Sequence, residues 1–360
     1  MVMDLSELLK KALQYDGSDV FIIPGSAIVT KSHGKMIELT DSRVMPSDVE
    51  TLVRQAYALA GRSIEIIDQA GDDDFSFAVK DVSRFRCNTY RQRGTLAATM
   101  RTVAFGLPDA QKLHIPDTVM KLSELRSGMV LVTGPAGNGK STTLACLVDR
   151  INQTRSGHII TIEDPIEYLH PHKKSLVSQR EVPGDAATFA RALRAALRQA
   201  PDVIMLGEMR DTETISTAIT AAETGHLLLS SLHTIGAAKT IDRVVDAFPA
   251  SQQNQIRAQL SMVLKAVISQ RLLLTKDGEQ IPVFEVMCVN PAIQNLIREG
   301  KTHQIDNAIY GGGADMISMD TELARLVKEG KITSETAHLY AIHPETLDRP
   351  GMDRPIRSFR

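Results

Sequence analysis

A glycine-rich segment in the middle of the chain constrains its fold more than any other feature. Residues 134–141 read Gly-Pro-Ala-Gly-Asn-Gly-Lys-Ser, which matches the phosphate-binding pattern GxxxxGK(S/T). The apolar run Met129–Thr133 predicts a strand before it, and residues from Ser141 to about Asn152 predict a helix after it. This order of strand, glycine turn and helix directs backbone N–H groups toward phosphate oxygens. The segment therefore predicts an α/β domain with a phosphate-binding loop (P-loop, residues 134–141).

The P-loop also predicts which residues meet a nucleotide. Lys140 is expected to reach the β- and γ-phosphates, and the Ser141 hydroxyl is expected to ligate Mg²⁺. The expected nucleotide-binding stretch is Gly134, Pro135, Ala136, Gly137, Asn138, Gly139, Lys140, Ser141 and Thr142. The alternative is a glycine-rich turn that carries a lysine by chance, and it does not account for the flanking strand and helix.

Further predicted strands end on side chains that suit phosphate hydrolysis. In an open α/β sheet, ligands bind outside the carboxyl ends of the strands. We expect Glu163 to align the attacking water, with Asp164 as a helper on the metal side. Glu208 is expected to hold Mg²⁺ through water or to orient the attacking water, and His233 to sense the γ-phosphate. The strands concerned are His158–Glu163, Val203–Leu206 and the apolar core of His226–His233.

Each of these assignments has a structural alternative. Glu208 could be an exposed acid that happens to follow a strand, and Asp164-Pro165 could simply start a turn. His226 lies at the opposite end of its strand from His233, so topology argues against the same role for it. A structural role for His226 is equally open.

The residues ahead of the P-loop predict a separate α+β domain at 1–105. Its expected helices are Asp4–Tyr15 and Ser47–Ala60, with Ser47 as the N-cap of the second. Its expected strands are Asp19–Lys31, Lys35–Leu39, Asp74–Val79, Arg84–Tyr90 and Thr95–Val103. The periodicity then fails around Gly106, Pro108 and Pro116, which places a linker at 106–116.

Residues 117–344 alternate between predicted strands and helices, which is typical of a doubly wound sheet. The expected helices are Ala187–Gln199, Thr212–Thr224, Ala237–Phe248 and Ser251–Ser269. A hairpin is expected at Arg271–Thr275 and Pro282–Val289, followed by a helical region from Pro291 with a break at 311–313. The segment 345–360 has little apolar content and is expected to be a disordered tail.

Composition excludes several classes of protein. The 360 residues carry 41 Lys and Arg against 43 Asp and Glu, a net charge of −2, so overall charge gives no support to a nucleic-acid partner. Three isolated cysteines, Cys87, Cys146 and Cys288, cannot form a four-cysteine zinc site. No apolar run approaches the ~18 residues needed to span a bilayer. We therefore expect a cytoplasmic protein, or one that visits a membrane face.

Several arginines gather near the end of the first predicted domain, at positions 84, 86, 91, 93 and 101. A solvated face is the ordinary interpretation of such charges. The alternative is that some of them are arginine fingers that complete an active site in a neighbouring subunit. The residues alone leave both interpretations open.

Four segments together resemble the ATPases of the secretion superfamily. Residues 134–142, 161–167, 202–211 and 225–234 resemble its Walker A motif, Asp box, Walker B motif and His box. Residues 179–182 (Gln-Arg-Glu-Val) and 192–198 lie between them as in that family. The segment Ala292–Ile305 resembles a hallmark of its type IV pilus retraction branch, the PilT-type motors of twitching motility. The resemblance extends to about Pro344.

The resemblance implies a PAS-like N-terminal domain, then a RecA-like P-loop ATPase domain with a helical C-terminal part. It implies a homo-hexamer that hydrolyses ATP with Mg²⁺ to drive pilus retraction. The partner would be the platform protein of the pilus machinery, with the motor peripheral at the cytoplasmic face of the inner membrane. By position, Arg86 and Arg101 match the family's phosphate-reaching arginines. The sequence departs from the family's pattern at Ala136 and Asn138 in the P-loop, at Pro183-Gly184-Asp185 after the Asp box, at residues 311–313 and in the tail.

Other functions remain to be weighed against a retraction motor. The nearest is an accessory retraction motor or a secretion-system ATPase of the same superfamily. A RecA-like nucleic-acid translocase is disfavoured because no basic–aromatic strip is present. A GTPase is disfavoured because no NKxD motif appears, and a non-enzymatic scaffold because Lys140, Ser141, Glu163 and Glu208 are all in place.

Overall fold

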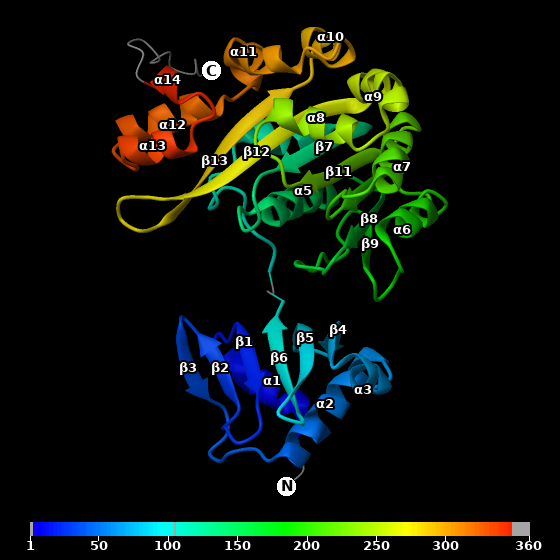
Figure 1. The fold of residues 1–360 in the computed structure, drawn as a ribbon, viewed down its shortest axis with the longest axis vertical. Helices are drawn as coiled ribbons and strands as arrows, with labels where there is room; N and C mark the ends of the chain where they lie inside the picture. Colours follow the sequence, from blue (N-terminus) through cyan, green and yellow to red (C-terminus); the bar gives the residue numbers. More distant parts are fainter. Residues whose placement is uncertain (1–2, 104–105, 348–360) are drawn as a thin grey trace. The chain divides into compact units, whose positions relative to one another are not determined.

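The computed structural model describes residues 3–103 and 106–347, which fall into two compact units. The N-terminal unit comprises Met1–Gly106 with the short segment Pro165–Leu169, and the C-terminal unit comprises Leu107–Asp164 with His170–Arg360. Figure 1 shows an antiparallel sheet with helices in the first unit and a larger sheet with helices on both faces in the second. The expected order of an α+β part and an α/β part is confirmed. Domain limits at 105, 116 and 344 stay a prediction.

The N-terminal unit is built on a sheet of order β3-β2-β1-β6-β5-β4, in which neighbouring strands are antiparallel. Its elements are α1 (Leu5–Gln14), β1 (Asp19–Ile22), β2 (Val29–Ser32), β3 (Lys35–Glu38), α2 (Pro46–Ala60), α3 (Glu65–Ala70), β4 (Asp72–Val79), β5 (Ser83–Gln92) and β6 (Thr95–Thr102). Alternate side chains of β5 are buried, including Phe85 and Cys87, against the core that α1 and α2 complete. The other face of the sheet therefore carries the polar side chains, Arg86 among them.

Two predictions for this unit were wrong in detail. The expected strand Asp19–Lys31 is two strands, because Pro24 and Gly25 (φ 82°) turn the chain between β1 and β2. The N-cap of α2 is Met45 rather than Ser47, since Pro46 occupies the first helical turn and lacks an N–H. The Met45 N–H instead donates to Asp48 Oδ2 at 2.8 Å. Helix α3 was not expected.

The C-terminal unit is built on a sheet of order β13-β12-β7-β11-β10-β8-β9, parallel except for β13. Its strands are β7 (Gly128–Thr133), β8 (His158–Glu163), β9 (Leu176–Glu181), β10 (Val203–Leu206), β11 (Leu227–Leu232), β12 (Leu264–Leu274) and β13 (Gln280–Cys288). Every residue of β7, β10 and β11 is buried, as both covered faces of a parallel sheet require.

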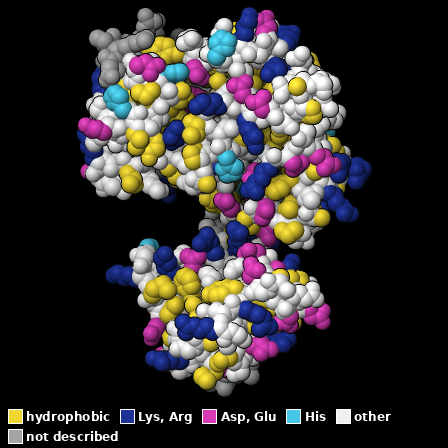
Figure 2. Space-filling view, in the orientation of Figure 1, with side chains coloured by type: hydrophobic (Ala, Val, Ile, Leu, Met, Phe, Trp, Pro, Cys, Tyr) yellow, Lys and Arg dark blue, Asp and Glu magenta, His cyan; other side chains and the backbone are white. Residues whose placement is uncertain are grey.

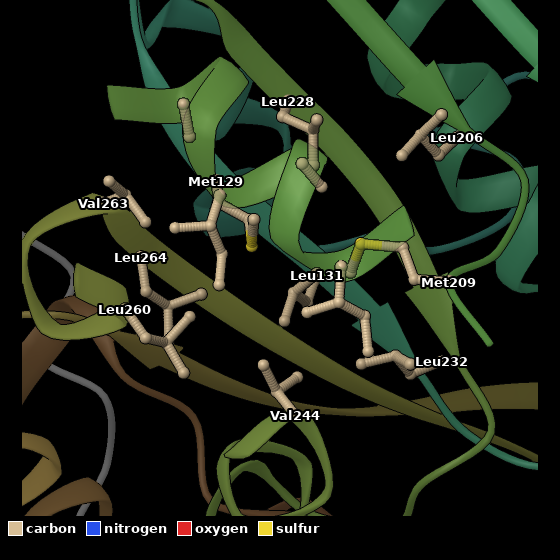
Figure 3. Close-up of a cluster of buried hydrophobic side chains, with 14 of the residues drawn as sticks. Met129, Leu131, Leu206, Met209, Leu228, Leu232, Val244, Leu260, Val263 and Leu264 are labelled. Carbon is tan, nitrogen blue, oxygen red and sulfur yellow. The ribbon is translucent and has the colours of Figure 1, made fainter. Parts of the chain in front are cut away.

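Helices cover both faces of this sheet. One face carries α4 (Asp117–Lys121), η1 (Leu122–Glu124) and α5 (Lys140–Thr154), whose apolar side chains pack on Val130 and Val132. The opposite face carries α6 (Phe189–Ala196), α7 (Thr212–Glu223), α8 (Ala237–Asp246) and α9 (Ala250–Val263), which pack on Met129 and Leu131. Figure 3 shows that second cluster, with Leu228 and Leu232 of β11 near Met129 and Leu131 of β7, and Leu206 of β10 farther away.

The largest difference between the predicted and the observed elements lies after α9. The expected helix Ser251–Ser269 ends at Val263, and Leu264 begins strand β12. The run Ala266–Ile268 is buried between β7 and β13, so three consecutive apolar residues lack a period of two and resemble part of a buried helix. Strand β9, at the other edge of the sheet, was not expected.

The last part of the chain is helical, as expected, and packs near β13. It contains α10 (Pro291–Arg298), η2 (Thr302–Gln304), α11 (Ile305–Tyr310), η3 (Gly313–Asp315), α12 (Met319–Lys328), α13 (Ser334–Tyr340) and α14 (Pro344–Leu347). Residues 345–347 of the expected disordered tail are helical in α14, and 348–360 lie outside the described residues. Among residues 3–103 and 106–347, no helix combines the length and apolar composition that crossing a membrane requires.

Candidate active site

The P-loop joins β7 to α5, and its backbone requires glycine at defined places. Gly134 has φ 142°, and a Cβ there would lie 2.2 Å from the Gln270 carbonyl oxygen of β12. Gly137 and Gly139 have φ 75° and 77°, a left-handed conformation that side chains disfavour. Lys140, Ser141 and Thr142 then form the first turn of α5. The whole predicted nucleotide-binding stretch therefore has the shape of a phosphate cradle at a helix N-terminus.

The ammonium group of Lys140 is held at the loop. The Lys140 side chain is 7% exposed, and its Nζ donates to the Pro135 carbonyl oxygen at 2.9 Å. His233 Nδ1, from the residue after β11, lies 3.5 Å from the same Nζ. A lysine held in this way presents its charge with little loss of conformational freedom when a phosphate binds.

His233 connects the lysine to Glu208. Its Nε2 lies 3.3 Å from Glu208 Oε2, and the Arg210 Nε lies 2.7 Å from that same oxygen. The Glu208 side chain is 12% exposed, whereas that of His233 is 50% exposed. Glu208 is therefore an acid whose carboxylate is oriented by a cation and an imidazole, at the end of a buried strand.

Glu163, the last residue of β8, has its carboxylate oriented from two sides. The Thr161 hydroxyl donates to Glu163 Oε1 at 2.6 Å, and Gln179 Nε2 of β9 donates to the same oxygen at 3.2 Å. Thr161 is fully buried and Glu163 is 7% exposed. This side chain is not the freely solvated acid of a surface turn.

The sheet order brings these residues together. The P-loop follows β7, His233 follows β11, Glu208 follows β10, and Glu163 ends β8. These four strands are neighbours in the order β7-β11-β10-β8. Gly207, which follows β10, lies beside Glu163, since a Cβ at Gly207 would be in van der Waals contact with the Glu163 Cα at 3.4 Å. The Ser231 hydroxyl donates to the Gly207 carbonyl at 2.6 Å and ties β11 to β10. The predicted convergence at the carboxyl edge is what the structure contains.

The donor set fits a magnesium ion that shares its ligands with a nucleotide. Within the described residues no group of three or more His, Cys, Asp or Glu side chains is arranged to hold a metal alone. Mg²⁺ commonly binds through one or two protein oxygens, several waters and substrate phosphates. Ser141 in the first turn of α5 and Glu208 at the same sheet edge supply oxygens of that kind.

Arg86 and Arg101 belong to the N-terminal unit, not to this sheet edge. They are directly opposite each other on β5 and β6, and both side chains are exposed. Arg101 Nε donates to Asp19 Oδ1 at 2.9 Å. Burial raises the pKa of Asp19, but hydrogen bonds from Arg101 and Ser18 outweigh it, so the pKa lies below its ordinary value.

Sequence reasoning missed the side chains that support the site. Asn138 Oδ1 accepts from the Leu272 N–H at 2.7 Å, and the Thr143 hydroxyl donates to Gln270 Oε1 at 2.6 Å, so β12 holds both the loop and α5. Thr161 could have been found, because it precedes Glu163 by two residues on a predicted strand and shares its face. No local pattern signals Gln270.

His226 lies at the opposite edge from the P-loop, before β11. Its Nδ1 is 2.9 Å from the Ala221 carbonyl oxygen and 3.1 Å from the Thr224 hydroxyl, at the C-terminal end of α7. These contacts favour its structural interpretation over a role in catalysis.

Known proteins share these features over most of the chain. Residues 1–347 match the family described as Type II/IV secretion system protein. A "Twitching motility protein" of Neisseria gonorrhoeae is 45% identical over 317 residues, 88% of this chain and 84% of the relative. The "Type IV pilus retractation ATPase PilT" of Pseudomonas aeruginosa is 42% identical over 346 residues, 96% of this chain and 100% of the relative.

A solved structure agrees with the fold as well as the sequence. The crystal structure of the pilus retraction motor PilT with bound ADP matches with a TM-score of 0.87 at 44% identity, over 96% of this chain and 98% of the other. The expected fold class, with a PAS-like unit and then a RecA-like P-loop unit, is thereby confirmed.

Proposed function

Because this chain belongs to the Type II/IV secretion system protein family, we propose that it is an ATP-hydrolysing motor that powers type IV pilus retraction. The observation that carries the enzymatic part is the set of contacts at neighbouring strand ends. Lys140, His233 and Glu208 form a connected chain of contacts at 3.5 and 3.3 Å. Glu163 ends the strand next to β10.

In this proposal each side chain has a task that its position suits. The P-loop amides and Lys140 hold the phosphates, and Glu163 accepts a proton from the attacking water while aligning it with the γ-phosphate. Ser141 and Glu208 would hold Mg²⁺, Glu208 through water, and the ion would supply neutralisation of phosphate charge. His233 lies between Lys140 and Glu208, where it can respond to the γ-phosphate.

Arg86 and Arg101 complete the proposed site as arginine fingers, across a gap between domains or subunits of a homo-hexamer. The motor would act peripherally at the cytoplasmic face of the inner membrane, on the platform protein of the pilus machinery. A nucleic-acid partner is not expected. On the face in Figure 2, Lys and Arg side chains are interspersed with Asp and Glu rather than joined in one basic strip.

Hydrolysis of MgATP by the purified chain and its variants tests the enzymatic proposal. Lys140→Ala should reduce turnover below detection, because the β- and γ-phosphates lose their cation. Glu208→Gln should slow turnover by roughly 10²-fold or more while nucleotide binding remains. Lys174→Ala, at an exposed lysine of the same unit, is the matched control. Wild-type turnover in both site variants would disprove the assignment.

The segment Ala292–Ile305 tests the retraction part of the proposal. Ile293 and Ile297 of α10 are fully buried. Lys301, His303 and Gln304, which follow α10, are exposed. Replacing these three exposed residues with alanine should leave substantial ATPase activity and abolish pilus retraction. Lys331→Ala is the control for loss of one exposed lysine in the same region. Persistence of both ATPase activity and retraction in the triple variant would show that the segment only packs, and the retraction assignment would lose its most specific support.

A further inference from the structure

One oxygen of the Glu163 carboxylate receives hydrogen bonds from two different strands. The Thr161 hydroxyl lies 2.6 Å from Glu163 Oε1, and Gln179 Nε2 lies 3.2 Å from the same atom. Thr161 and Glu163 are two residues apart on β8, so both side chains point to the same face. Gln179 reaches them from β9, which pairs with β8 in parallel.

A third contact determines which way the Gln179 amide points. Gln179 Oε1 accepts the backbone N–H of His170 at 2.7 Å. An amide oxygen can only accept and the amide nitrogen can only donate. Because the His170 N–H takes the oxygen, the nitrogen is the atom directed at Glu163. The donor to Glu163 is thus fixed by the backbone and not by a free choice of amide orientation.

Such an arrangement has a chemical consequence for a buried carboxylate. Burial disfavours the charged form of an acid, and hydrogen bonds that it accepts restore the charged form. Two donors on one oxygen also restrict rotation of the carboxylate, which a base in line with a water requires. Thr161 and Gln179 both contact the Glu163 carboxylate, so each can act on the site through Glu163.

We propose that Thr161 and Gln179 are positioning residues that hold the Glu163 carboxylate aligned for hydrolysis. The inference rests on the proposed function, in which Glu163 aligns and deprotonates water. It assigns to the two side chains an effect on turnover and none on nucleotide binding.

Variants that remove one donor each, with little change of shape, test the inference. Thr161→Val replaces the hydroxyl with a methyl group, and Thr161→Ser keeps the hydroxyl. Gln179→Glu keeps an oxygen for the His170 N–H but puts an oxygen where the donor nitrogen was. Thr161→Val and Gln179→Glu should each lower kcat for ATP by roughly tenfold or more, with KM and ADP affinity within about twofold. Thr161→Ser should recover most of the lost rate.

A double-mutant cycle separates positioning from a general loss of structure. In a Glu163→Gln background there is no carboxylate to position, so adding Thr161→Val should lower the residual rate less than twofold. A purely structural role for Thr161 would lower it again by the full amount and would overturn the inference. Thr89→Val makes the same change at a fully buried threonine of the N-terminal unit and should leave kcat unaltered.

The two proposals fail in different ways. Normal turnover in Glu163→Gln itself would overturn the proposed role of Glu163. Lost turnover in Glu163→Gln with normal kcat in Thr161→Val and Gln179→Glu would overturn only the positioning role. Should Thr161→Val not fold, Gln179→Glu gives the same decision, because Gln179 is only half-buried.

Discussion

The residues proposed for catalysis are held very differently in the two units. In the C-terminal unit, Lys140, Glu163 and Glu208 are largely buried, and each has a hydrogen-bond or ion-pair partner at 2.6–2.9 Å. In the N-terminal unit, Arg86 and Arg101 are exposed on an antiparallel sheet. The C-terminal unit by itself therefore holds in place the side chains proposed to bind phosphate and to align water. The proposed arginine fingers, in contrast, are exposed on the surface of the N-terminal unit.

The largest expected effect on ATP turnover comes from replacing the two exposed arginines of the N-terminal unit. Arg86→Ala and Arg101→Ala should each reduce ATP turnover by ~10³–10⁵-fold, the contribution of an arginine finger, with nucleotide binding and fold retained. Steady-state ATPase assays and ADP titration measure both properties.

Arg54→Ala provides the control for this experiment, since Arg54 is an exposed arginine of α2 that pairs with Glu50 at 2.7 Å. Near-normal turnover in Arg86→Ala and Arg101→Ala would return the pair to its ordinary interpretation as a solvated face. The contrast between the two units would then carry no functional meaning.

Mutations in the two hydrophobic cores compare the two units through the free energy of unfolding. Phe85 is fully buried in the N-terminal core and Leu131 in the sheet of the C-terminal unit. Phe85→Ala should cost about 3–5 kcal/mol and Leu131→Ala about 2–5 kcal/mol. Only Leu131 lies on the strand that runs into the P-loop, so only Leu131→Ala should also weaken ADP binding. Chemical denaturation and ADP titration test this, and equal weakening by both variants would contradict it.

The smallest effect concerns another buried acid, Glu285, whose neutral form is favoured by its surroundings. Burial, with Asp306 and Asp320 nearby, raises the pKa of Glu285 to about 7, although the Ala237 and Met319 backbone N–H groups oppose it. His343 and Glu345 line the same cavity of about 240 Å³. The folded state therefore binds an extra proton between the unfolded pKa of 4.5 and about 7. Stability is present below this window and is lost as pH rises through it.

Wild type should accordingly lose on the order of 3 kcal/mol relative to Glu285→Gln between pH 4.5 and 8. Gln keeps an oxygen for the Ala237 N–H, which lies 2.9 Å from Glu285 Oε1. Urea denaturation of both proteins at several pH values gives the difference. Parallel stability curves would show that Glu285 is ionised in the folded state throughout.

The sequence predicted those parts of the site that local patterns define. The P-loop, Glu163, Glu208 and His233 were found because each follows a short apolar strand, and parallel strands align their carboxyl ends. The first part of β12, Leu264–Ser269, was predicted as the end of a helix, because residues 266–270 are all buried and have no period of two. The strand predicted at Arg271–Thr275 covers most of the remainder of β12. The edge strand β9 turns one face inward, but two of the three residues on that face, Gln179 and Glu181, are polar, so no apolar alternation marks it as a strand.

What sequence reasoning could not find are the contacts between distant segments. Gln179 orients Glu163 from 16 positions away, and Gln270 meets Thr143 from 127 positions away. Both depend on which strands become neighbours in the sheet, and no window of the sequence contains that information. Arg86 and Arg101 were singled out by position, and their role stays a prediction; the Asp19 partner of Arg101 lies 82 positions away and was not predicted.

The contact between Asn138 and Leu272, 134 positions apart, has a consequence for biosynthesis. At about 5–20 residues per second, about 7 to 27 seconds of translation separate these 134 positions. Until β12 is made, the all-buried strand β7 has β11 on one side only and presents an unpaired apolar edge. A chain that stops before Leu264 keeps that edge open. We therefore expect the nascent protein to be most prone to aggregate between synthesis of the proposed catalytic residues and pairing of β12 with β7.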